Sequence, residues 1–224
     1  MSAKSFSFRI SLLLLCIVAA AAVSIPAERS PYPATIAALQ TAYDEEIIAH
    51  DRCVAFAEKA QEEDFPEIAN FFTVIAASEG VHARNYKKLL SRLGAKPKKH
   101  EKETVAVSTT SRNLKAATAA EIEQIEKVYP ALLEQMKQEN HAGAIKAVLR
   151  ELESEKQHLK LIKQIRAASE DFFGILSRKM EQKPQQYYIC QVCGAIAANN
   201  PPETCPICKG AGSNYKAVAR SPEK

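Results

Sequence analysis

Four long stretches with helical apolar periodicity, joined by links of unequal length, constrain what this 224-residue chain can fold into. We expect four helices, at about residues 35–63, 66–93, 113–138 and 142–168. Pro66 suits a first helical turn and Gly94 suits a helix end. Residues 95–112 are basic, then Ser/Thr-rich, and carry no period. Each pair of helices with a short link therefore forms an antiparallel hairpin, and the long link crosses between the hairpins.

This order of links is that of a ferritin-like four-helix bundle, so the predicted fold class is all-α with a long crossover between the second and third helices. The composition agrees. The chain has only 7 Gly, few for a strand-and-turn fold, and its 46% hydrophobic and 25% charged residues exclude collagen, a disordered tail and a multi-span membrane protein. The net charge of +4 gives no reason to expect nucleic acid as a partner.

The first 24 residues have the three-part pattern of a secretory signal peptide. Lys4 and Arg9 form a basic start, the 14 residues from Ile10 to Val23 are almost wholly apolar, and small residues stand at Ala22 and Ser24. The alternative is an uncleaved membrane anchor, but a helix that spans a bilayer needs roughly 20 apolar residues. We therefore expect cleavage, export to the periplasm and no membrane attachment of the mature protein.

Each predicted helix carries a glutamate on its apolar face. These glutamates are Glu46, Glu79, Glu121 and Glu155. An ionised carboxylate costs several kcal/mol to bury unless it is paired or binds a metal. The glutamates that we expect to lie off these faces, in solvent, are Glu45, Glu123, Glu126, Glu151 and Glu153. The four glutamates on the apolar faces therefore need a common explanation.

The spacing of these four glutamates repeats between the two halves of the bundle. Glu46 and Glu79 are 33 residues apart, and Glu121 and Glu155 are 34 apart. The second helix of each pair carries Glu-x-x-His, which puts an imidazole one turn beyond the carboxylate on the same face. One glutamate from each first helix and one Glu-x-x-His from each second helix is the ligand set of di-iron or di-manganese bundles. The predicted ligands are Glu46, Glu79, His82, Glu121, Glu155 and His158; a single Glu-x-x-His could equally belong to a solvated helix face.

Four of the six cysteines form a second candidate site. Cys190 and Cys193 make one Cys-x-x-Cys turn, and Cys205 and Cys208 make another 11 residues later. Two such turns can wrap one tetrahedral metal with four thiolates, and the spacing does not choose between iron and zinc. Two disulfides are the alternative in an oxidising compartment. They are disfavoured because each would close a small, strained loop.

These motifs together resemble the rubrerythrin family, over nearly everything after residue 34. The resemblance rests on Ala55-Phe-Ala-Glu-Lys-Ala60, Glu79-x-x-His82-Ala83, Val128-Tyr129-Pro130, Cys190-x-x-Cys193-Gly and Cys205-Pro-x-Cys208. It implies a non-haem di-iron centre held by the six bundle residues, which are also the catalytic residues, and a rubredoxin-like iron centre. It further implies reduction of hydrogen peroxide to water, an electron donor that the sequence does not identify, and a homodimer arranged head to tail.

Three features depart from the family pattern. Gln124 stands where the family commonly has a further glutamate, and Cys53 stands where it often has a tyrosine. Cys53 is expected to pack inside the bundle near the metals. The export signal is unusual for a family that is mostly cytoplasmic.

The predicted organisation has four parts: a signal peptide at 1–24, a di-iron bundle at 34–168, a connector at 169–186 and a rubredoxin-like domain at 187–218. Two other functions use parts of the same pattern. One is a ferroxidase or iron-handling protein, which would use the bundle ligands without a separate electron entry point. The other is a structural or binding protein whose four cysteines hold zinc.

Overall fold

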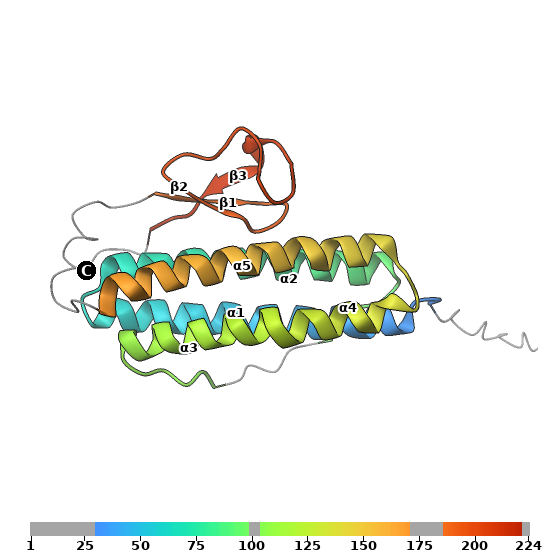
Figure 1. The fold of residues 1–224 in the computed structure, drawn as a ribbon, viewed down its shortest axis with the longest axis horizontal. Coiled ribbons are helices and arrows are strands. Elements are labelled where there is room, and N and C mark those ends of the chain that lie inside the picture. Colours follow the sequence, from blue (N-terminus) through green and yellow to red (C-terminus); the bar gives the residue numbers. More distant parts are fainter. Residues whose placement is uncertain (1–29, 99–103, 171–185, 221–224) are drawn as a thin grey trace, which may run out of the picture.

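A computed structural model describes residues 30–98, 104–170 and 186–220 (Figure 1). The predicted signal peptide and most of the predicted connector lie outside these residues. The bundle consists of α1 (Pro33–Glu62), α2 (Pro66–Arg92), a third helix made of α3 (Thr110–Glu123), η1 (Gln124–Val128) and α4 (Tyr129–Lys137), and α5 (Ala142–Glu170). The four long helices lie side by side, as predicted. In the described residues no helix is long and apolar enough to cross a bilayer.

The helix ends follow local rules of the sequence. Proline occupies the first turn of both α1 and α2, where a missing backbone N–H costs nothing. At the end of α2, Gly94 has φ +74°, and the Ala95 amide donates to the Leu90 carbonyl at 2.9 Å. This is a Schellman end, which needs a residue that tolerates positive φ. The Glu139 carboxylate accepts hydrogen bonds from the amides of Ala34 and Thr35 at 2.8 and 2.7 Å, which ties the start of α1 to the loop before α5.

The third helix contains a π-helical turn that the sequence analysis did not predict. In η1 the backbone N–H of Tyr129 donates to the carbonyl of Gln124, five residues back. Pro130 follows directly, and a proline inside a regular helix would leave a carbonyl one turn earlier without its donor. The extra residue in the turn also changes which side chains face the bundle interior after residue 124.

The bundle core is split into two apolar clusters with a polar layer between them. One cluster includes Phe56, Phe72 and Ile75 and extends to residues of the C-terminal unit. The other includes Leu39, Leu90 and further residues of α4 and α5. The predicted carboxylates and imidazoles lie in the polar layer, each at most 4% exposed. The apolar clusters therefore isolate this layer from solvent at both ends.

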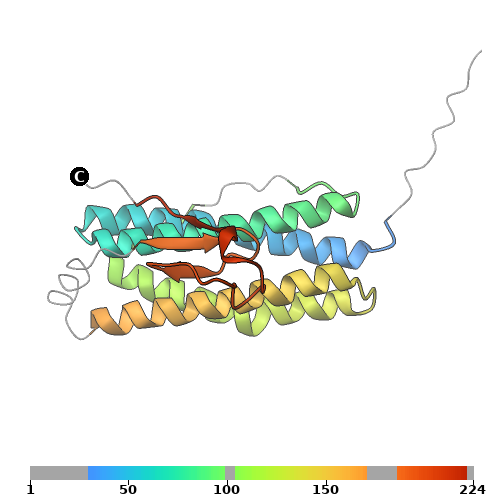
Figure 2. The same cartoon turned by 90° about the horizontal axis from the view of Figure 1, so that it is seen from above.

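The C-terminal unit is a small three-stranded antiparallel sheet that sits on the bundle. Its strands are β1 (Tyr187–Cys190), β2 (Ile196–Ala198) and β3 (Tyr215–Ala217), in the order β2-β1-β3. It lies across α2 and α5, and Figure 2 shows it from above over the central part of the bundle. Tyr187 and Ile189 of β1 belong to the same apolar cluster as Phe72 of α2. The unit and the bundle therefore share part of one core.

Candidate metal centres

The polar layer brings the six predicted bundle residues together in two overlapping groups. The ligand atoms of Glu46, Glu79, His82 and Glu155 all lie within 4.8 Å of one another. Those of Glu79, Glu121, Glu155 and His158 meet the same condition. Glu79 and Glu155 belong to both groups. Two positions that share two carboxylates are the arrangement of a dinuclear site with bridging ligands.

Both imidazoles turn the same edge toward the carboxylates. Nδ1 of His82 lies 2.8 Å from Glu155, 3.1 Å from Glu79 and 3.4 Å from Glu46. Nδ1 of His158 lies 3.1 Å from Glu155 and 3.3 Å from Glu79. A single ring nitrogen cannot donate its proton to three oxygens at once. In the described part of the chain, Nδ1 of His82 and both carboxylate oxygens of Glu79 have no hydrogen bond of good geometry.

The electrostatics of this layer fit two bound cations. Burial and the charge of Glu155 raise the pKa of Glu46 to about 8, and the same two causes raise the pKa of Glu121. The two imidazoles oppose this effect and lower the pKa of Glu155, so burial and mutual repulsion of the carboxylates act most strongly on Glu46 and Glu121. The four carboxylates carry four negative charges when all are ionised, and two divalent ions would balance them. Buried oxygen ligands with imidazole caps suit iron or manganese.

Tyr129 links two of these carboxylates. Its hydroxyl donates to Glu46 at 2.9 Å and lies 3.4 Å from Glu155. Burial and the charge of Glu46 raise the pKa of Tyr129, so the hydroxyl keeps its proton and remains a donor. Tyr129 was named in the sequence analysis for the family pattern only, and the contact gives it a place beside the site.

Glu151 is the residue that the sequence analysis misjudged. It was expected in solvent, but it is 0% exposed. The Asn85 amide donates to it at 3.1 Å, and the Tyr86 hydroxyl faces it. The signal was present in the sequence, because Glu151 precedes Glu155 by four residues and therefore shares its face of α5.

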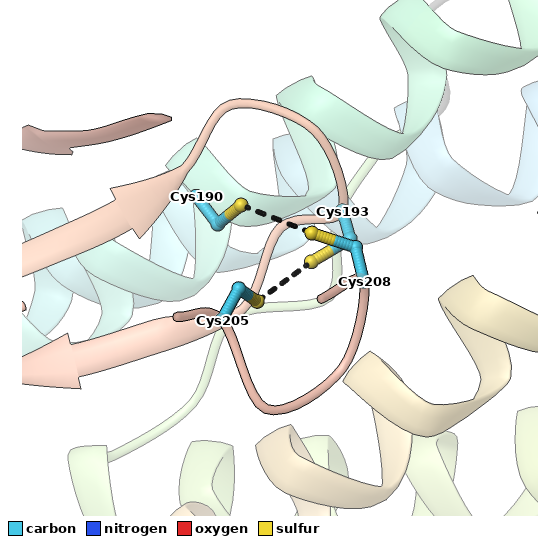
Figure 3. A group of neighbouring side chains, drawn as sticks. All are labelled: Cys190, Cys193, Cys205 and Cys208. Atoms are coloured by element: carbon cyan, nitrogen blue, oxygen red, sulfur yellow. Dashed lines mark hydrogen bonds between the residues drawn. The ribbon is translucent and has the colours of Figure 1, made fainter. Parts of the chain in front are cut away.

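The four cysteines form a second cluster in the C-terminal unit (Figure 3). Sγ of Cys190 lies 3.7 Å from Sγ of Cys208, and Sγ of Cys193 lies 3.6 Å from Sγ of Cys205. All four are free thiols, so the disulfide alternative does not hold in this structure. Four sulfurs around an ion at about 2.3 Å would be roughly 3.8 Å apart. The cluster therefore has the dimensions of a tetrathiolate metal site.

The two Cys-x-x-Cys turns repeat one backbone design. In each, the residue after the second cysteine donates its amide to the carbonyl of the first, at 2.9 Å for Gly194 and 3.0 Å for Lys209. Both residues have positive φ, +77° and +62°. The Cys193 thiol and nearby backbone amides lower the pKa of Cys190 to about 5, and the same contact raises the pKa of Cys193, so that Cys190 is the member of this pair that ionises first. A thiol that ionises readily is ready to bind a metal.

The first of these turns touches the imidazoles of the bundle. Nε2 of His82 lies 3.1 Å from the Cys193 carbonyl oxygen, and the Ser78 hydroxyl donates to the Gly194 carbonyl at 2.7 Å. Ser78 also lies 2.9 Å from Nε2 of His158. The two sites are therefore joined within one chain.

Three other residues close to the predicted ligands have clear positions. His50 pairs with Asp51 at 2.9 Å and is not part of either ligand group. Cys53 is 3% exposed, and burial and the charge of Glu79 raise the pKa of its thiol. Its position inside the bundle agrees with the expectation. Gln124 donates to Glu45 at 3.2 Å, away from both ligand groups.

Comparisons with known proteins agree with both sites. A family model described as rubrerythrin matches residues 37–166, and one described as the rubredoxin-like domain of rubrerythrin matches residues 188–216. Rubrerythrin-2 of Clostridium acetobutylicum is 30% identical over 175 residues, covering 76% of this chain and 89% of that protein. Nigerythrin of Nitratidesulfovibrio vulgaris is 27% identical over 177 residues, covering 78% and 81%.

Solved structures show the same fold. The fully reduced, all-ferrous nigerythrin superposes with a TM-score of 0.69 at 25% identity, covering 82% of this chain and 86% of that one. The bacterioferritin of Desulfovibrio desulfuricans superposes with a TM-score of 0.65 at 20% identity, covering 70% and 91%. The predicted ferritin-like fold class is confirmed by these likenesses.

Proposed function

Because this chain belongs to the rubrerythrin family, we propose that it reduces hydrogen peroxide to water. The family carries a di-iron site in its bundle and a rubredoxin-like iron site. The observation that carries the proposal is the pair of overlapping ligand groups in direct contact with a four-cysteine site. An iron-storage function would not need that contact.

Six residues hold the two irons in this proposal. Glu79 and Glu155, which belong to both ligand groups, would contribute to both metal positions. Glu46 and His82 would complete one ligand group, and Glu121 and His158 would complete the other. When bound, two ferrous ions supply the two electrons that cleave an O–O bond and stabilise the charge that develops on oxygen. The burial of all six side chains keeps bulk water out of the site.

The remaining side chains around the site hold protons and fix orientation. Reduction of one peroxide to two waters takes up two protons and two electrons. The Tyr129 hydroxyl donates to Glu46 and keeps that carboxylate in place. The Cys193 carbonyl contacts Nε2 of His82, and the Ser78 hydroxyl contacts Nε2 of His158. Nδ1 of each ring is therefore free to bind a metal ion.

Electrons enter through the four-cysteine centre in this proposal. A tetrathiolate iron has no open coordination position, so it carries one electron at a time and does not bind peroxide. The contact between the Cys193 carbonyl and His82 supports transfer from this centre to the bundle, because it joins a thiolate ligand residue to an imidazole ligand.

Two neighbouring glutamates of α5 test the bundle site. Glu155→Gln should lose most of the bound di-metal and the peroxide turnover, because Glu155 belongs to both ligand groups. Glu153→Gln is the matched control, since Glu153 is exposed, pairs with Lys156 at 2.6 Å and is part of neither ligand group. Metal analysis and peroxide consumption are measured on both. Full metal content and turnover in Glu155→Gln would refute the assignment.

The route of the electrons is tested with two cysteine variants. Cys205→Ser should remove the visible thiolate-to-iron absorption and stop steady turnover, while a pre-reduced bundle site still consumes one peroxide. Cys53→Ala, which lies outside the four-cysteine cluster, should keep both the absorption and the turnover. A colourless wild-type protein that contains zinc would favour the structural function, and turnover that persists in Cys205→Ser would exclude this electron route.

We also propose that the mature protein is periplasmic and forms a homodimer. The basic, apolar and small-residue pattern of residues 1–24 supports export. N-terminal sequencing of protein from the periplasmic fraction should begin after Ala22 or Ser24, and an intact Met1 in the cytoplasm would contradict the proposal. Light scattering should give twice the mass of one chain.

A further inference from the structure

A basic cleft lies beside the four-cysteine unit, outside both metal sites. It has a volume of about 330 Å³ and lies between the C-terminal half of α2 and the N-terminal half of α5. In Figure 1 these halves extend beyond the part of the bundle that the unit covers. Four cations line the cleft: Lys88 and Arg92 from α2, and Lys146 and Arg150 from α5. No carboxylate is among its lining residues.

The positions of these cations are electrostatically unfavourable for the folded protein. Lys88 and Arg92 are four residues apart on one helix, and Lys146 and Arg150 are four apart on the other, so each helix carries a pair of like charges on one face. In the described part of the chain none of the four has an ion pair within 4.0 Å, and the buried Nε of Arg150 has no hydrogen-bond partner. Such a cluster suits an anionic ligand.

The cleft also borders the first cysteine turn. Gln191 and Val192, which lie between Cys190 and Cys193 in the sequence, form part of its lining. Asn85 donates to the Val192 carbonyl at 3.0 Å and fixes this border against α2. Anything seated in the cleft therefore contacts the turn that holds two of the four thiolates.

We propose that this cleft is the docking surface for an acidic one-electron carrier protein that reduces the four-cysteine centre. The inference rests on the proposed function and assigns the surface on which its electron donor docks. In each encounter the carrier is oxidised by one electron and the four-cysteine centre is reduced by one. Two encounters match the two electrons that one peroxide takes up, and the two protons come from solvent.

The distribution of charge favours a protein over a small anion. Lys88, Arg92 and Lys146 are exposed, and they are spread along two helices and do not converge on one point. An extended basic surface steers an acidic partner into one orientation and raises its association rate at low salt. Because the cysteine turn borders the cleft, a partner bound in this orientation lies next to the redox centre.

Charge reversal tests the proposal with a matched control. Lys88→Glu/Lys146→Glu reverses two charges in the cleft. Lys115→Glu/Lys163→Glu makes the same change of net charge at exposed positions that do not line the cleft. The probe is reduced flavodoxin, an acidic flavoprotein whose semiquinone absorbs apart from a ferric tetrathiolate. An uncharged hydroquinone is the reference reductant. The rate of reduction of the four-cysteine centre is followed by stopped flow without peroxide.

We expect the flavodoxin rate constant to fall about tenfold or more in the cleft variant, and to change by less than about twofold in the control variant. The difference should vanish at high salt, and the hydroquinone rates should not change. Calorimetric titration with oxidised flavodoxin should show weaker binding to the cleft variant alone, which is a readout independent of electron transfer.

Four results would overturn the proposal. They are equal rate losses in both variants, no loss in either, a change of oligomeric state confined to the cleft variant, and tight binding of inorganic phosphate that the cleft variant loses while the flavodoxin rate is unchanged. The third would assign the cleft to a second copy of the chain, and the fourth to a small anion. A wild-type protein without tetrathiolate absorption would instead refute the proposed function, and this inference with it.

Discussion

Single side chains around the bundle site decide how its carboxylates are held. The Tyr129 hydroxyl is the donor that joins Glu46 and Glu155. Tyr129→Phe should weaken metal binding by about tenfold or more, because a lost partner of a metal ligand leaves that ligand less well oriented. Competition with a coloured chelator measures the change.

Tyr43→Phe is the control for this prediction. Tyr43 is a partly buried tyrosine that packs against the second apolar cluster, and within the described residues its hydroxyl makes no hydrogen bond to either ligand group. Its metal affinity should equal that of the wild type. If Tyr129→Phe also binds metal as tightly as the wild type, then the hydroxyl does not orient Glu46.

Glu151 makes a prediction about pH. Burial raises its pKa in the folded protein, although His82, Tyr86, Asn85 and Arg150 oppose this shift. The folded state therefore binds the proton more tightly than the unfolded state. Below the pKa of Glu151 in the unfolded chain, the protonated carboxyl makes its full contribution to the free energy of unfolding. This contribution is lost as the pH rises through the higher pKa of the folded protein.

Glu151→Gln replaces this carboxyl with a group that does not titrate. The free energy of unfolding of the variant should therefore improve relative to the wild type as the pH rises above the ordinary carboxyl pKa. Denaturant titrations at several pH values measure the difference. A difference that does not depend on pH would mean that Glu151 is ionised in the folded protein as well.

At the scale of elements, the docking of the cysteine turn depends on one glycine. A Cβ added at Gly194 would lie 2.2 Å from Nε2 of His82 and 2.6 Å from the Ser78 hydroxyl. Gly194→Ala should therefore displace the C-terminal unit from α2. Hydrogen exchange at the amides of residues 191–196 should increase, and electron transfer to the bundle should slow.

Gly94→Ala separates this effect from backbone strain. Gly94 has φ +74°, close to the +77° of Gly194, but a Cβ there would have no neighbour within 4 Å. Its variant should lose only about 1–2 kcal/mol of stability, the ordinary cost of a side chain in the left-handed region. If both variants keep the cysteine turn docked, the contact tolerates a methyl group and the argument from packing fails.

Some elements could be predicted from the sequence and others could not. The start of α2 at Pro66 and its end near Gly94 follow from local chemistry, and the structure has both. The four glutamates and two histidines were found because apolar periodicity makes a buried charge conspicuous. The π-helical turn gave only the indirect signal of Pro130 inside a helical pattern. Glu151 shares a face of α5 with Glu155, which the pattern of α5 contains, but the side chains that face it, Asn85 and Tyr86, belong to α2 and could not be assigned to it from the sequence.

The docking of the two units was beyond the reach of the sequence. It depends on hydrogen bonds between groups that are distant in the chain, such as the Gln157 side chain with the backbone of Ile196 at 2.8 and 3.0 Å. No periodicity or local motif records such a contact. The resemblance to a family gave the parts and their chemistry, but the contact within one chain came from the structure.

At the scale of the whole molecule, the two sites should respond separately to loss of metal. The polar layer lies between two apolar clusters of the bundle, while the cysteines have a small apolar cluster of their own. Removing the bundle metals should lower the free energy of unfolding of the bundle. The expected loss is about 2.7 kcal/mol if the free metal concentration before removal was one hundred times its Kd.

The absorption of the tetrathiolate centre should survive this treatment. Thermal unfolding followed by circular dichroism reports on the bundle, and the visible spectrum reports on the cysteine unit. Re-addition of ferrous iron should restore the melting temperature. Simultaneous loss of both signals on mild chelation would show that the two units unfold together.

The π-helical turn has a consequence for how relatives of this chain are aligned. In a regular helix, the eight steps of the chain from Glu121 to Tyr129 would turn Tyr129 by about 80° away from Glu121. The additional residue in η1 restores a shared direction, and Tyr129 reaches Glu46. A relative with an unbroken third helix must therefore lack one residue between these positions. An alignment of such a relative with this chain would then need a one-residue gap in the middle of a helix. A gap there is normally taken for an alignment error, but in this case it would mark a real difference in the number of residues.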